Sequence, residues 1–276
     1  MPTSSLDQAR RKIQVESWRI EERQEAIAQR GLDGWPKDSP EDLEEIERLR
    51  LCLRDLPDPP VLLHPIHPIK LRVDVNISPT MAYYFLLGDY EESDLELIEA
   101  FICPGDRVVE CGGGAGITGA FAAHCSGNSI VLVEPSESMH STILGNFEAN
   151  GEPCKIIGAA VVPDGFEGDH LNIHINEEYW WTTTRTNAGG RPEPVPVIRI
   201  SELLRREQPT VLLMDIEGAE VGLLPKSLPA DLRLIIAELH TPDIGDEATA
   251  EIVNSIVSQG FKLKRIKAQT WVFGRD

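Results

Sequence analysis

The sequence predicts an α/β fold in which a mostly parallel sheet is closed by an antiparallel hairpin and preceded by a helical extension. From Leu95 onward, short runs rich in Val, Ile and Leu alternate with segments of helical periodicity, which is typical of parallel strands covered by helices on both faces. Near the end of the chain, two strand-like runs are joined by about three residues, which is too short for a crossover helix and therefore predicts a hairpin.

The first sixty residues form the predicted extension. Residues 6–30 and 40–55 combine charged and apolar residues at helical spacing, so we expect two short amphipathic helices. A proline-rich stretch at residues 57–60 follows as a stiff boundary that no helix crosses. We therefore divide the chain into a helical extension, residues 1–60, and a main domain, residues 61–276.

The main domain contains five predicted strands before the hairpin. They are short and apolar, and they cover residues 107–111, 129–134, 155–161, 211–215 and 234–239. Helices are predicted between them, at 116–125, 136–149, 201–207 and 246–258. The closing hairpin pairs residues 261–266 with 270–273. Residues 163–197 are long for a connection and predict a functional loop or an extra hairpin, whose adjacent Trp180 and Trp181 could border a ligand.

Composition bounds the surroundings and the partners of the protein. A formal net charge of −19 gives a surface that repels phosphate backbones and lipid headgroups, so we expect neither nucleic acid nor a membrane as a partner. The five cysteines are odd in number and lack CxxC spacing, which indicates buried thiols in a reducing compartment. The chain has neither a signal-peptide pattern nor a membrane-spanning apolar stretch, so a cytoplasmic location is expected.

A glycine-rich loop follows the first predicted strand. Glu110 ends this strand, and glycines then allow the backbone to turn sharply and approach a ligand closely. A carboxylate at this point would attract a cofactor that carries a cationic sulfonium and an ammonium group, whereas it would repel a pyrophosphate. The loop therefore predicts a site for S-adenosylmethionine, with these binding residues: Glu110, Gly112, Gly114 and Gly116.

A second acid supports a nucleoside site. Glu134 ends the next strand 24 residues after Glu110, close to the roughly 20-residue spacing at which an acid binds ribose hydroxyls. Pro135, which follows this acid, and Ala160, near the end of the third predicted strand, complete the predicted cofactor contacts from these strands.

An NAD-type oxidoreductase is the main alternative. Residues 114–119 also satisfy the GxGxxG pattern of dinucleotide sites, and Glu134 would again bind ribose. Against this alternative, further glycines precede the match and Glu110 would repel a pyrophosphate. A third hypothesis is a non-catalytic nucleoside-binding module whose acidic N-terminal helices recruit a partner.

Four motifs together resemble the FkbM family of methyltransferases. They are Gly88-Asp-Tyr-Glu91, the stretch from Pro104 to Gly116, Val133-Glu-Pro135 with Asn146 and Asn150, and Asp215-Ile-Glu-Gly-Ala-Glu220. The resemblance spans roughly residues 75–273 and implies a class I, Rossmann-like fold with a seven-stranded sheet and S-adenosylmethionine as cofactor. It also implies O-methylation of a hydroxyl group on a small molecule such as a natural product or a sugar. By the same resemblance Glu91 is a cofactor-binding candidate, whereas Leu213 stands where the family commonly has Lys.

Polar residues at the ends of two neighbouring strands are the candidate catalytic groups. Ligands of open α/β sheets bind beyond the carboxyl ends of the strands, where this chain carries the pairs Asp215 with Glu217 and Glu238 with His240. Residues two apart on a strand face the same way, so the four are expected to converge. His240 is the predicted general base because an unperturbed imidazole is largely neutral at pH 7. Asp215 could orient the acceptor or approach the cofactor, and Glu238 could hold the tautomer of the imidazole.

Three alternatives stay open at this stage. Asp215, Glu238 and a neighbouring oxygen could bind a divalent cation such as Mg²⁺, which would lower the pKa of the acceptor hydroxyl. Glu217 and Glu220 could simply be acids that satisfy the dipole at a helix N-terminus. The N-terminal helices could pair two chains into a homodimer, or they could cover the chain's own domain.

Overall fold

The structure is a computed structural model that describes residues 40–54, 59–175 and 191–275. The helix predicted at residues 6–30 and the tryptophans at 180 and 181 lie outside these ranges.

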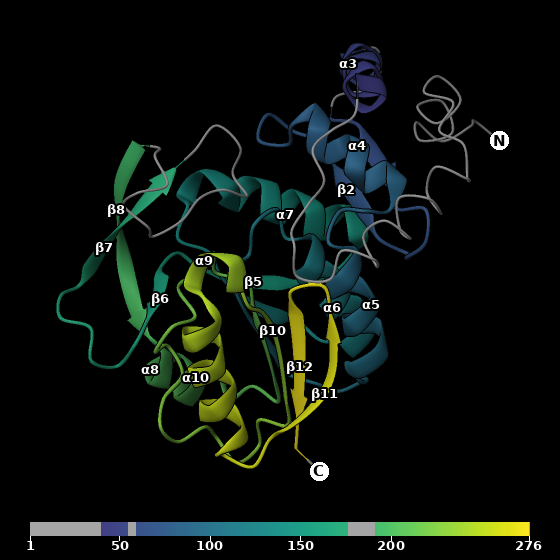
Figure 1. Ribbon diagram of the computed structural model, residues 1–276. Coiled ribbons are helices and arrows are strands. Elements are labelled where there is room, and N and C mark those ends of the chain that lie inside the picture. Colours follow the sequence, from purple (N-terminus) through teal and green to yellow (C-terminus); the bar gives the residue numbers. More distant parts are fainter. Residues whose placement is uncertain (1–39, 55–58, 176–190, 276) are drawn as a thin grey trace.

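A seven-stranded sheet forms the centre of the molecule (Figure 1). Its strand order is β11-β12-β10-β9-β3-β4-β5. The five parallel strands are β3 (Val108–Cys111), β4 (Ile130–Val133), β5 (Cys154–Ile157), β9 (Val211–Met214) and β10 (Leu234–Glu238). The hairpin of β11 (Lys262–Lys267) and β12 (Thr270–Gly274) adds the two antiparallel strands at one edge. The predicted fold class is therefore confirmed.

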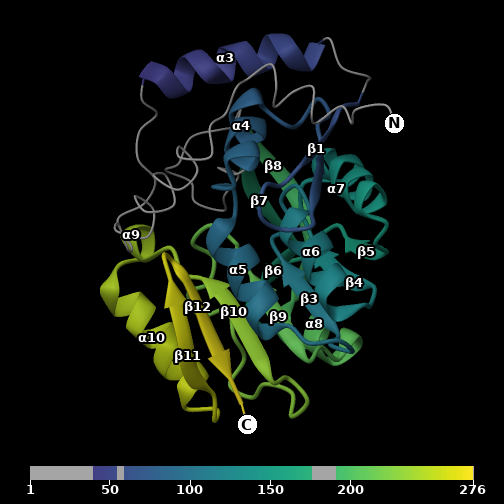
Figure 2. The same ribbon diagram turned by 90° about the vertical axis from the view of Figure 1, so that its right-hand side faces the viewer.

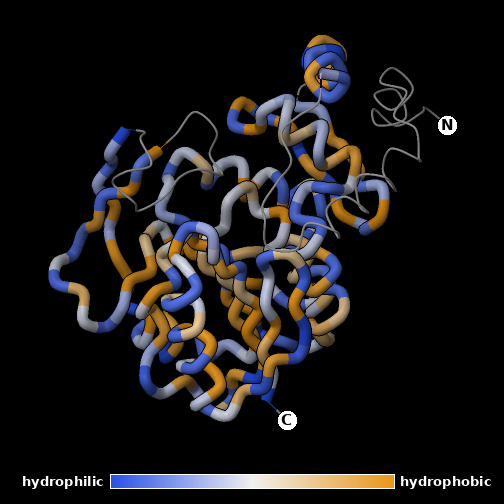
Figure 3. Tube along the Cα trace, viewed as in Figure 1, coloured by the Kyte–Doolittle hydropathy of each residue, from blue (hydrophilic) through white to orange (hydrophobic). Residues whose placement is uncertain are grey.

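Helices cover both faces of this sheet (Figures 1 and 2). One face packs against α5 (Glu92–Phe101), α6 (Ile117–Ser126) and α7 (Glu137–Asn150), and the other against α8 (Ile200–Glu207) and α10 (Asp246–Val257). Alternate residues of each strand point to opposite faces, so Leu213 joins the first core and Leu212 the second. The apolar residues accordingly concentrate along the central strands (Figure 3).

The third predicted strand, 155–161, is wrong as a single element. β5 ends at Ile157, and β6 (Ala160–Val162) enters a separate three-stranded sheet of order β6-β8-β7. β5 is an edge strand of the main sheet, and a tight turn, in which Ala159 N–H donates to the Ile157 carbonyl, redirects the chain after it. The described parts of the 163–197 segment confirm the predicted extra hairpin, because β7 (His170–Ile175) pairs antiparallel with β8 (Arg191–Arg199).

The N-terminal region packs on the main domain through apolar side chains, among them the buried Leu49, and through a buried polar contact. The helix predicted at residues 40–55 is confirmed as α3 (Pro40–Arg54), which packs against α4 (Pro79–Leu87). Between Tyr83 of α4 and Asp42 of α3, the buried hydroxyl donates a 2.8 Å hydrogen bond to the carboxylate. The division into an extension and a main domain, and the pairing of two chains, remain predictions.

A two-stranded ribbon that was not predicted from the sequence lies between α3 and α4 in the chain. It consists of β1 (Val61–Leu63) and β2 (Lys70–Arg72), which pair antiparallel. Its strands are only three residues long, so they offer no periodicity from which to predict them. β2 contacts α7, the helix that carries Asn146 and Asn150.

The expected lack of a membrane-spanning helix and the expected burial of the cysteines can be compared with the described residues. Among them, no helix combines the length and apolar character needed to cross a membrane. The prediction of buried thiols holds for Cys111 but is wrong for Cys103, which is exposed, because it lies in the turn between α5 and β3.

Candidate active site

The glycine loop after β3 and the loop after β9 are packed directly against each other. Asp215 N–H donates a 2.9 Å hydrogen bond to the Cys111 carbonyl, and Gly112 N–H donates a 3.0 Å hydrogen bond to the Val133 carbonyl. Gly112 has a left-handed backbone with φ of 89°, and a Cβ at this position would overlap the carbonyl oxygen of Asp215. Only glycine satisfies both conditions. The predicted cofactor loop and the predicted reaction centre are therefore one continuous site.

Glu134 holds the cofactor loop from the side of β4. One carboxylate oxygen accepts a 3.0 Å hydrogen bond from Gly114 N–H, and the other accepts a 2.8 Å hydrogen bond from Ser136 N–H. Burial raises the pKa of Glu134 to about 7, and these backbone donors oppose the rise. The structure thus places Glu134 beside the loop, as the sequence predicted, with Pro135 half-buried next to it.

Glu110 lies beneath the start of α6 instead of facing the open cleft. Its side chain is buried, and Oε1 accepts a 2.5 Å hydrogen bond from the Thr118 hydroxyl. Burial raises the pKa of Glu110 to about 8. The hydrogen bond that the cofactor's ammonium group was predicted to donate to this carboxylate therefore competes with a contact inside the protein.

Gly119 makes room for Glu110, and the sequence interpretation missed this role. A Cβ on Gly119 would overlap Oε2 of Glu110. The third glycine of a GxGxxG pattern permits close packing of the helix on the strand. The same pattern that suggested a dinucleotide therefore has a packing explanation here.

Asn146 ties the cofactor loop to the N-terminal ribbon. Its buried side chain donates a 2.8 Å hydrogen bond to the Ala115 carbonyl and accepts a 2.6 Å hydrogen bond from Arg72 N–H. One turn later on α7, Asn150 makes the corresponding contacts with both backbone groups of Lys70, at 2.8 and 2.9 Å. Asn146 therefore contacts the loop as well as β2, whereas Asn150 contacts β2 and the backbone of its own helix.

We expect the substitution Asn146→Ala to weaken cofactor binding, because it frees the Ala115 carbonyl and leaves buried backbone groups without partners. Each such group costs about 1–3 kcal/mol, so the dissociation constant for S-adenosylhomocysteine should rise about tenfold or more. The matched control is Asn150→Ala, which removes the same side chain one turn away without touching the loop. Calorimetric titration of both variants checks the prediction, and equal affinities would contradict it.

Three carboxylates surround the His240 ring on the other side of the site. Nδ1 lies 2.9 Å from Oε1 of Glu220, and Nε2 lies 3.4 Å from Oε2 of Glu217 and 3.6 Å from Oδ1 of Asp215. The predicted convergence of the four polar residues is confirmed, because Glu238 also has an oxygen within 4.8 Å of ligand atoms of Asp215 and His240. Its cause differs from the predicted one, because β9 ends at Met214 and Glu217 has a left-handed backbone, so a turn brings the acids together.

Two predicted roles at this site are wrong. Glu238 does not hold His240, because within the described residues the ring's one hydrogen bond goes to Glu220, whereas Glu238 accepts a long 3.5 Å contact from Gln269. The interpretation of Glu217 and Glu220 as acids at a helix N-terminus also fails, since residues 217–223 form turns and no helix.

Glu238 also belongs to a second group of acids, formed with Glu91 and Asp94. Oxygen atoms of these three residues lie within 4.8 Å of one another. Glu91 precedes α5 with a left-handed backbone, and Asp94, which the sequence interpretation missed, accepts a 3.1 Å hydrogen bond from the Thr270 hydroxyl. Glu91 thus lies beside the reaction centre, and no described contact joins it to the glycine loop.

Burial and mutual repulsion raise the pKa of five carboxyl groups in this cleft. The pKa of Asp94 rises to about 7 and that of Glu217 to about 8, and the pKa values of Asp215, Glu91 and Glu238 are also raised. Each rise means that the ionised form lacks compensating positive charge. The cleft is therefore suited to a cationic ligand.

The ionisation of His240 differs from the sequence-based expectation of a ring that is largely neutral at pH 7. Burial lowers the pKa of the imidazole, but the hydrogen bond to Glu220 and the charges of Asp215 and Glu238 outweigh burial and raise it to about 10. The ring is consequently a cation at pH 7 in the ligand-free protein. It can act as a base only when the charge around it changes or the pH rises.

The same groups include possible ligands for a divalent cation. Asp215, Glu238 and His240 each offer one ligand atom, and these atoms lie within 4.8 Å of one another. Carboxylate oxygens suit a hard cation such as Mg²⁺, whereas an imidazole nitrogen is a less typical ligand for it.

Ala160 has a different environment from the predicted one. Because the chain leaves the main sheet after β5, the Ala160 side chain is buried in the small sheet, where it packs with Ile173 and Val195. The side chain of Ala160 is therefore part of the small sheet's core, and its contact with the cofactor remains a prediction.

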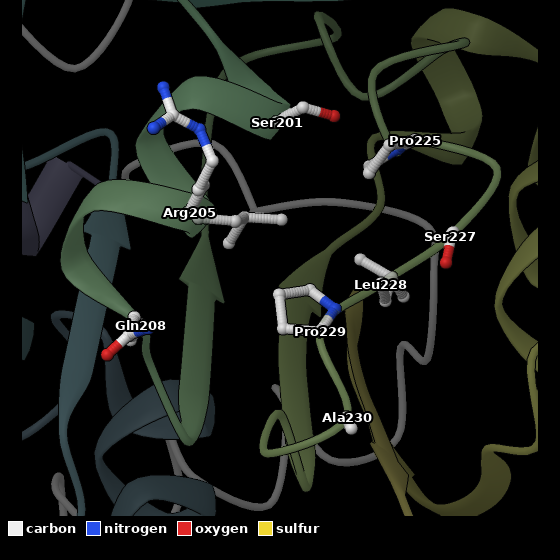
Figure 4. A pocket seen from close by; sticks show the side chains of 9 residues that line it. Ser201, Arg205, Gln208, Pro225, Ser227, Leu228, Pro229 and Ala230 are labelled. Atoms are coloured by element: carbon white, nitrogen blue, oxygen red, sulfur yellow. The ribbon is translucent and has the colours of Figure 1, made fainter.

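A surface pocket of about 530 Å³ lies along α8, away from this site (Figure 4). Its lining includes Gln208 and Ala230, which precede the amino ends of β9 and β10. The candidate residues lie at the opposite, carboxyl ends of the same strands. None of them lines the pocket.

Comparison with known proteins gives a family and a set of structural neighbours. A sequence model described as the methyltransferase FkbM domain matches residues 113–263. No curated protein sequence matches the chain. A methyltransferase from Pyrococcus furiosus is 12% identical with a TM-score of 0.40, and the alignment covers 76% of this chain and 91% of that one.

Two further solved structures have similar values. Aeropyrum pernix fibrillarin, in complex with S-adenosyl-L-methionine, is 12% identical with a TM-score of 0.39, and the alignment covers 66% of this chain and 73% of that one. Precorrin-6y C5,15-methyltransferase from Geobacter metallireducens is 8% identical with a TM-score of 0.39, and the alignment covers 68% of this chain and 88% of that one.

Proposed function

Because the chain belongs to the FkbM family of methyltransferases, we propose that it transfers a methyl group from S-adenosylmethionine to a hydroxyl group on a small molecule, such as a natural product or a sugar. The observation that carries this proposal is the direct packing of the glycine loop against the loop that bears Asp215. A methyl donor and an acceptor bound at these two loops would be neighbours. The family also removes the basis for the NAD-type alternative.

The cofactor half of the proposal rests on shape and charge. Gly112 and Gly116 have left-handed backbones that let the loop turn sharply, and Glu134 lies beside this loop, where it would bind the ribose hydroxyls. S-adenosylmethionine has a sulfonium, an ammonium and a carboxylate, and so carries net positive charge. Burial and neighbouring carboxylates raise the pKa values of Asp94 and Glu217, and a cation bound beside them would stabilise their ionised forms.

The residues after β9 and β10 supply alignment and a base in this proposal. S-adenosylmethionine, when bound, supplies an electrophilic methyl group. His240 accepts the hydroxyl proton at Nε2 as the new O–CH₃ bond forms and the S–CH₃ bond breaks, with its electron pair leaving on sulfur. Asp215 and Glu217 border Nε2 and orient the hydroxyl. A cationic cofactor nearby disfavours a protonated ring, so cofactor binding itself helps to prepare the base.

A divalent cation such as Mg²⁺ is the second form of this proposal. The proximity of Asp215, Glu238 and His240 favours it. In this form the residues would hold the cation and His240 would be a ligand, so no base would be required.

The proposed function is tested by ligand titration followed by methyl transfer. We expect calorimetry to detect binding of S-adenosylmethionine and S-adenosylhomocysteine and no binding of NAD. Radiolabelled methyl groups should then pass to members of a panel of polyhydroxylated small molecules, both with and without EDTA. Binding of NAD alone would overturn the proposal, binding without transfer to any acceptor would favour a non-catalytic module, and activity that requires added Mg²⁺ would select the metal-dependent form.

Cofactor binding is expected to release protons at pH 7. In the ligand-free protein Asp94, with a pKa of about 7, and Glu110 and Glu217, with pKa values of about 8, are partly or mostly protonated. A cation favours their ionised forms, so affinity should rise with pH through this range and level off above it. Calorimetry at pH 7 in phosphate and in Tris measures the release through the different buffer enthalpies. Equal binding enthalpies in the two buffers would contradict this expectation.

A further inference from the structure

The two nitrogens of the His240 ring have different surroundings. Nδ1 is within hydrogen-bond distance of a single carboxylate oxygen, that of Glu220 at 2.9 Å. Nε2 faces Glu217 and Asp215 at 3.4 and 3.6 Å, and the side chains of these two acids are 34% and 38% exposed, whereas that of Glu220 is 0% exposed. The ring therefore has a buried edge and an edge directed toward the open part of the site.

Glu220 is itself held in place before it contacts the ring. Oε1 also accepts a 3.1 Å hydrogen bond from Gly218 N–H, and the Glu220 carbonyl accepts a 3.2 Å hydrogen bond from Leu223 N–H. The loop that carries it is anchored at its start, where Asp215 N–H donates to the Cys111 carbonyl. A buried carboxylate is stable only with such partners, so its position is defined by the fold.

The backbone of His240 is fixed, but the orientation of its ring is not fixed by the backbone. The His240 carbonyl accepts hydrogen bonds from Asp243 N–H and Ile244 N–H, at 2.8 and 2.9 Å, where α9 (Thr241–Ile244) begins. These contacts leave rotation about the side-chain bonds free. Among the described residues, Glu220 is the hydrogen-bond partner of the ring.

We propose that Glu220 is a positioning residue that binds Nδ1–H of His240 and thereby presents Nε2 to the acceptor side of the site. This inference rests on the proposed methyl transfer. A carboxylate that orients a histidine in this way fixes the tautomer and the ring direction, and loss of such a partner typically costs 10- to 100-fold in metal affinity or activity where it has been studied. Without Glu220 the ring can turn so that either nitrogen pairs with Asp215 or Glu217.

The test compares Glu220→Ala, Glu220→Gln and the control Glu251→Gln, which makes the same amide change at an exposed position of α10. We expect Glu220→Ala to lower kcat by about 10- to 100-fold, with the S-adenosylhomocysteine dissociation constant within about threefold of the native value. Glu220→Gln keeps an acceptor oxygen of similar reach and should retain more of the activity. The control should behave as the native protein.

A second readout does not depend on activity. Nitrogen NMR of ¹⁵N-histidine-labelled protein reports which nitrogen of His240 is hydrogen-bonded, and the signal is assigned by its absence in His240→Gln. We expect a hydrogen-bonded Nδ1–H in the native protein and in Glu220→Gln, and its loss in Glu220→Ala. If Glu220→Ala does not fold, the glutamine variant carries the comparison.

The outcomes separate this inference from the proposed function. An unchanged His240 signal in Glu220→Ala, or a fall in kcat that follows a parallel loss of cofactor affinity and thermal stability, would overturn the positioning role. A native protein that shows the Nδ1 hydrogen bond but transfers no methyl group would instead overturn the proposed function and leave the contact intact.

Discussion

Replacement of His240 by glutamine is expected to lower kcat of methyl transfer by about 10²- to 10⁴-fold, the usual contribution of a positioned general base. Glutamine has a similar length and can still pair with Glu220, but it cannot accept a proton. Cofactor affinity should stay within about threefold, because His240 is not among the predicted cofactor contacts. Single-turnover methylation at saturating S-adenosylmethionine measures the effect.

The pH dependence of the same reaction gives an independent check on His240. A base must be deprotonated to act, so the rate rises as the pH passes upward through its pKa. The pKa of His240 is about 10 in the ligand-free protein, so kcat/KM for the cofactor should continue to rise above pH 8, where an ordinary histidine would already have levelled off. At saturating cofactor the midpoint should move to lower pH, because the bound cation disfavours the protonated ring.

The control for His240 is another histidine that is paired with a glutamate. His124 on α6 lies 3.4 Å from Glu152 and is 51% exposed, at the end of the helix far from the glycine loop. His124→Gln should therefore leave both kcat and the pH profile unchanged. A His240→Gln variant with near-native single-turnover rates would remove this residue as the base and would leave Asp215, Glu217 or a metal-bound hydroxyl for that role.

Substitution of Gly112 by alanine is expected to have the largest effect on the cofactor site. The added Cβ would overlap the Asp215 carbonyl, and this oxygen belongs to backbone that cannot swing aside like a flexible side chain. The two loops must separate or the protein must unfold. We expect a loss of unfolding free energy of about 3 kcal/mol or more and at least a 100-fold rise in the dissociation constant for S-adenosylhomocysteine.

Gly105 provides a matched control for this substitution. It has φ of 93°, close to the 89° of Gly112, but a Cβ there would meet nothing within 4 Å. Gly105→Ala should therefore show only the conformational cost of a left-handed residue, about 1–2 kcal/mol, and native cofactor affinity. Urea unfolding and calorimetric titration of both variants separate the clash from the strain. Similar losses in the two proteins would refute the close packing of the loops.

Most strands of the main sheet, and the acids and the histidine at their carboxyl ends, could be predicted from the sequence alone. The strands 108–111, 130–133, 211–214 and 234–238, their helices and the closing hairpin all follow from local periodicity and from turn lengths. Glu134 beside the glycine loop, and Asp215, Glu217 and His240 at one end of the sheet, also followed, because carboxyl ends of parallel strands lie together.

The remaining features were decided by contacts between residues that are distant in the sequence. Glu220 and His240 are 20 positions apart, and their pairing depends on a turn with no periodic signal. Arg72 and Asn146 are 74 positions apart, so the link that Asn146 makes between β2 and the cofactor loop could not be predicted from the sequence either.

The sequence by itself therefore determined the fold class, the family and which polar residues follow the central strands. These features depend on local patterns of apolar residues, glycines and acids. Only the tertiary structure decided which acid contacts Nδ1 of His240, where Glu110 points, and that neighbouring charges raise the pKa of the imidazole. The physical reason is that hydrogen bonds and ionisation depend on burial and on neighbouring charges, and these are set by the folded arrangement of several segments.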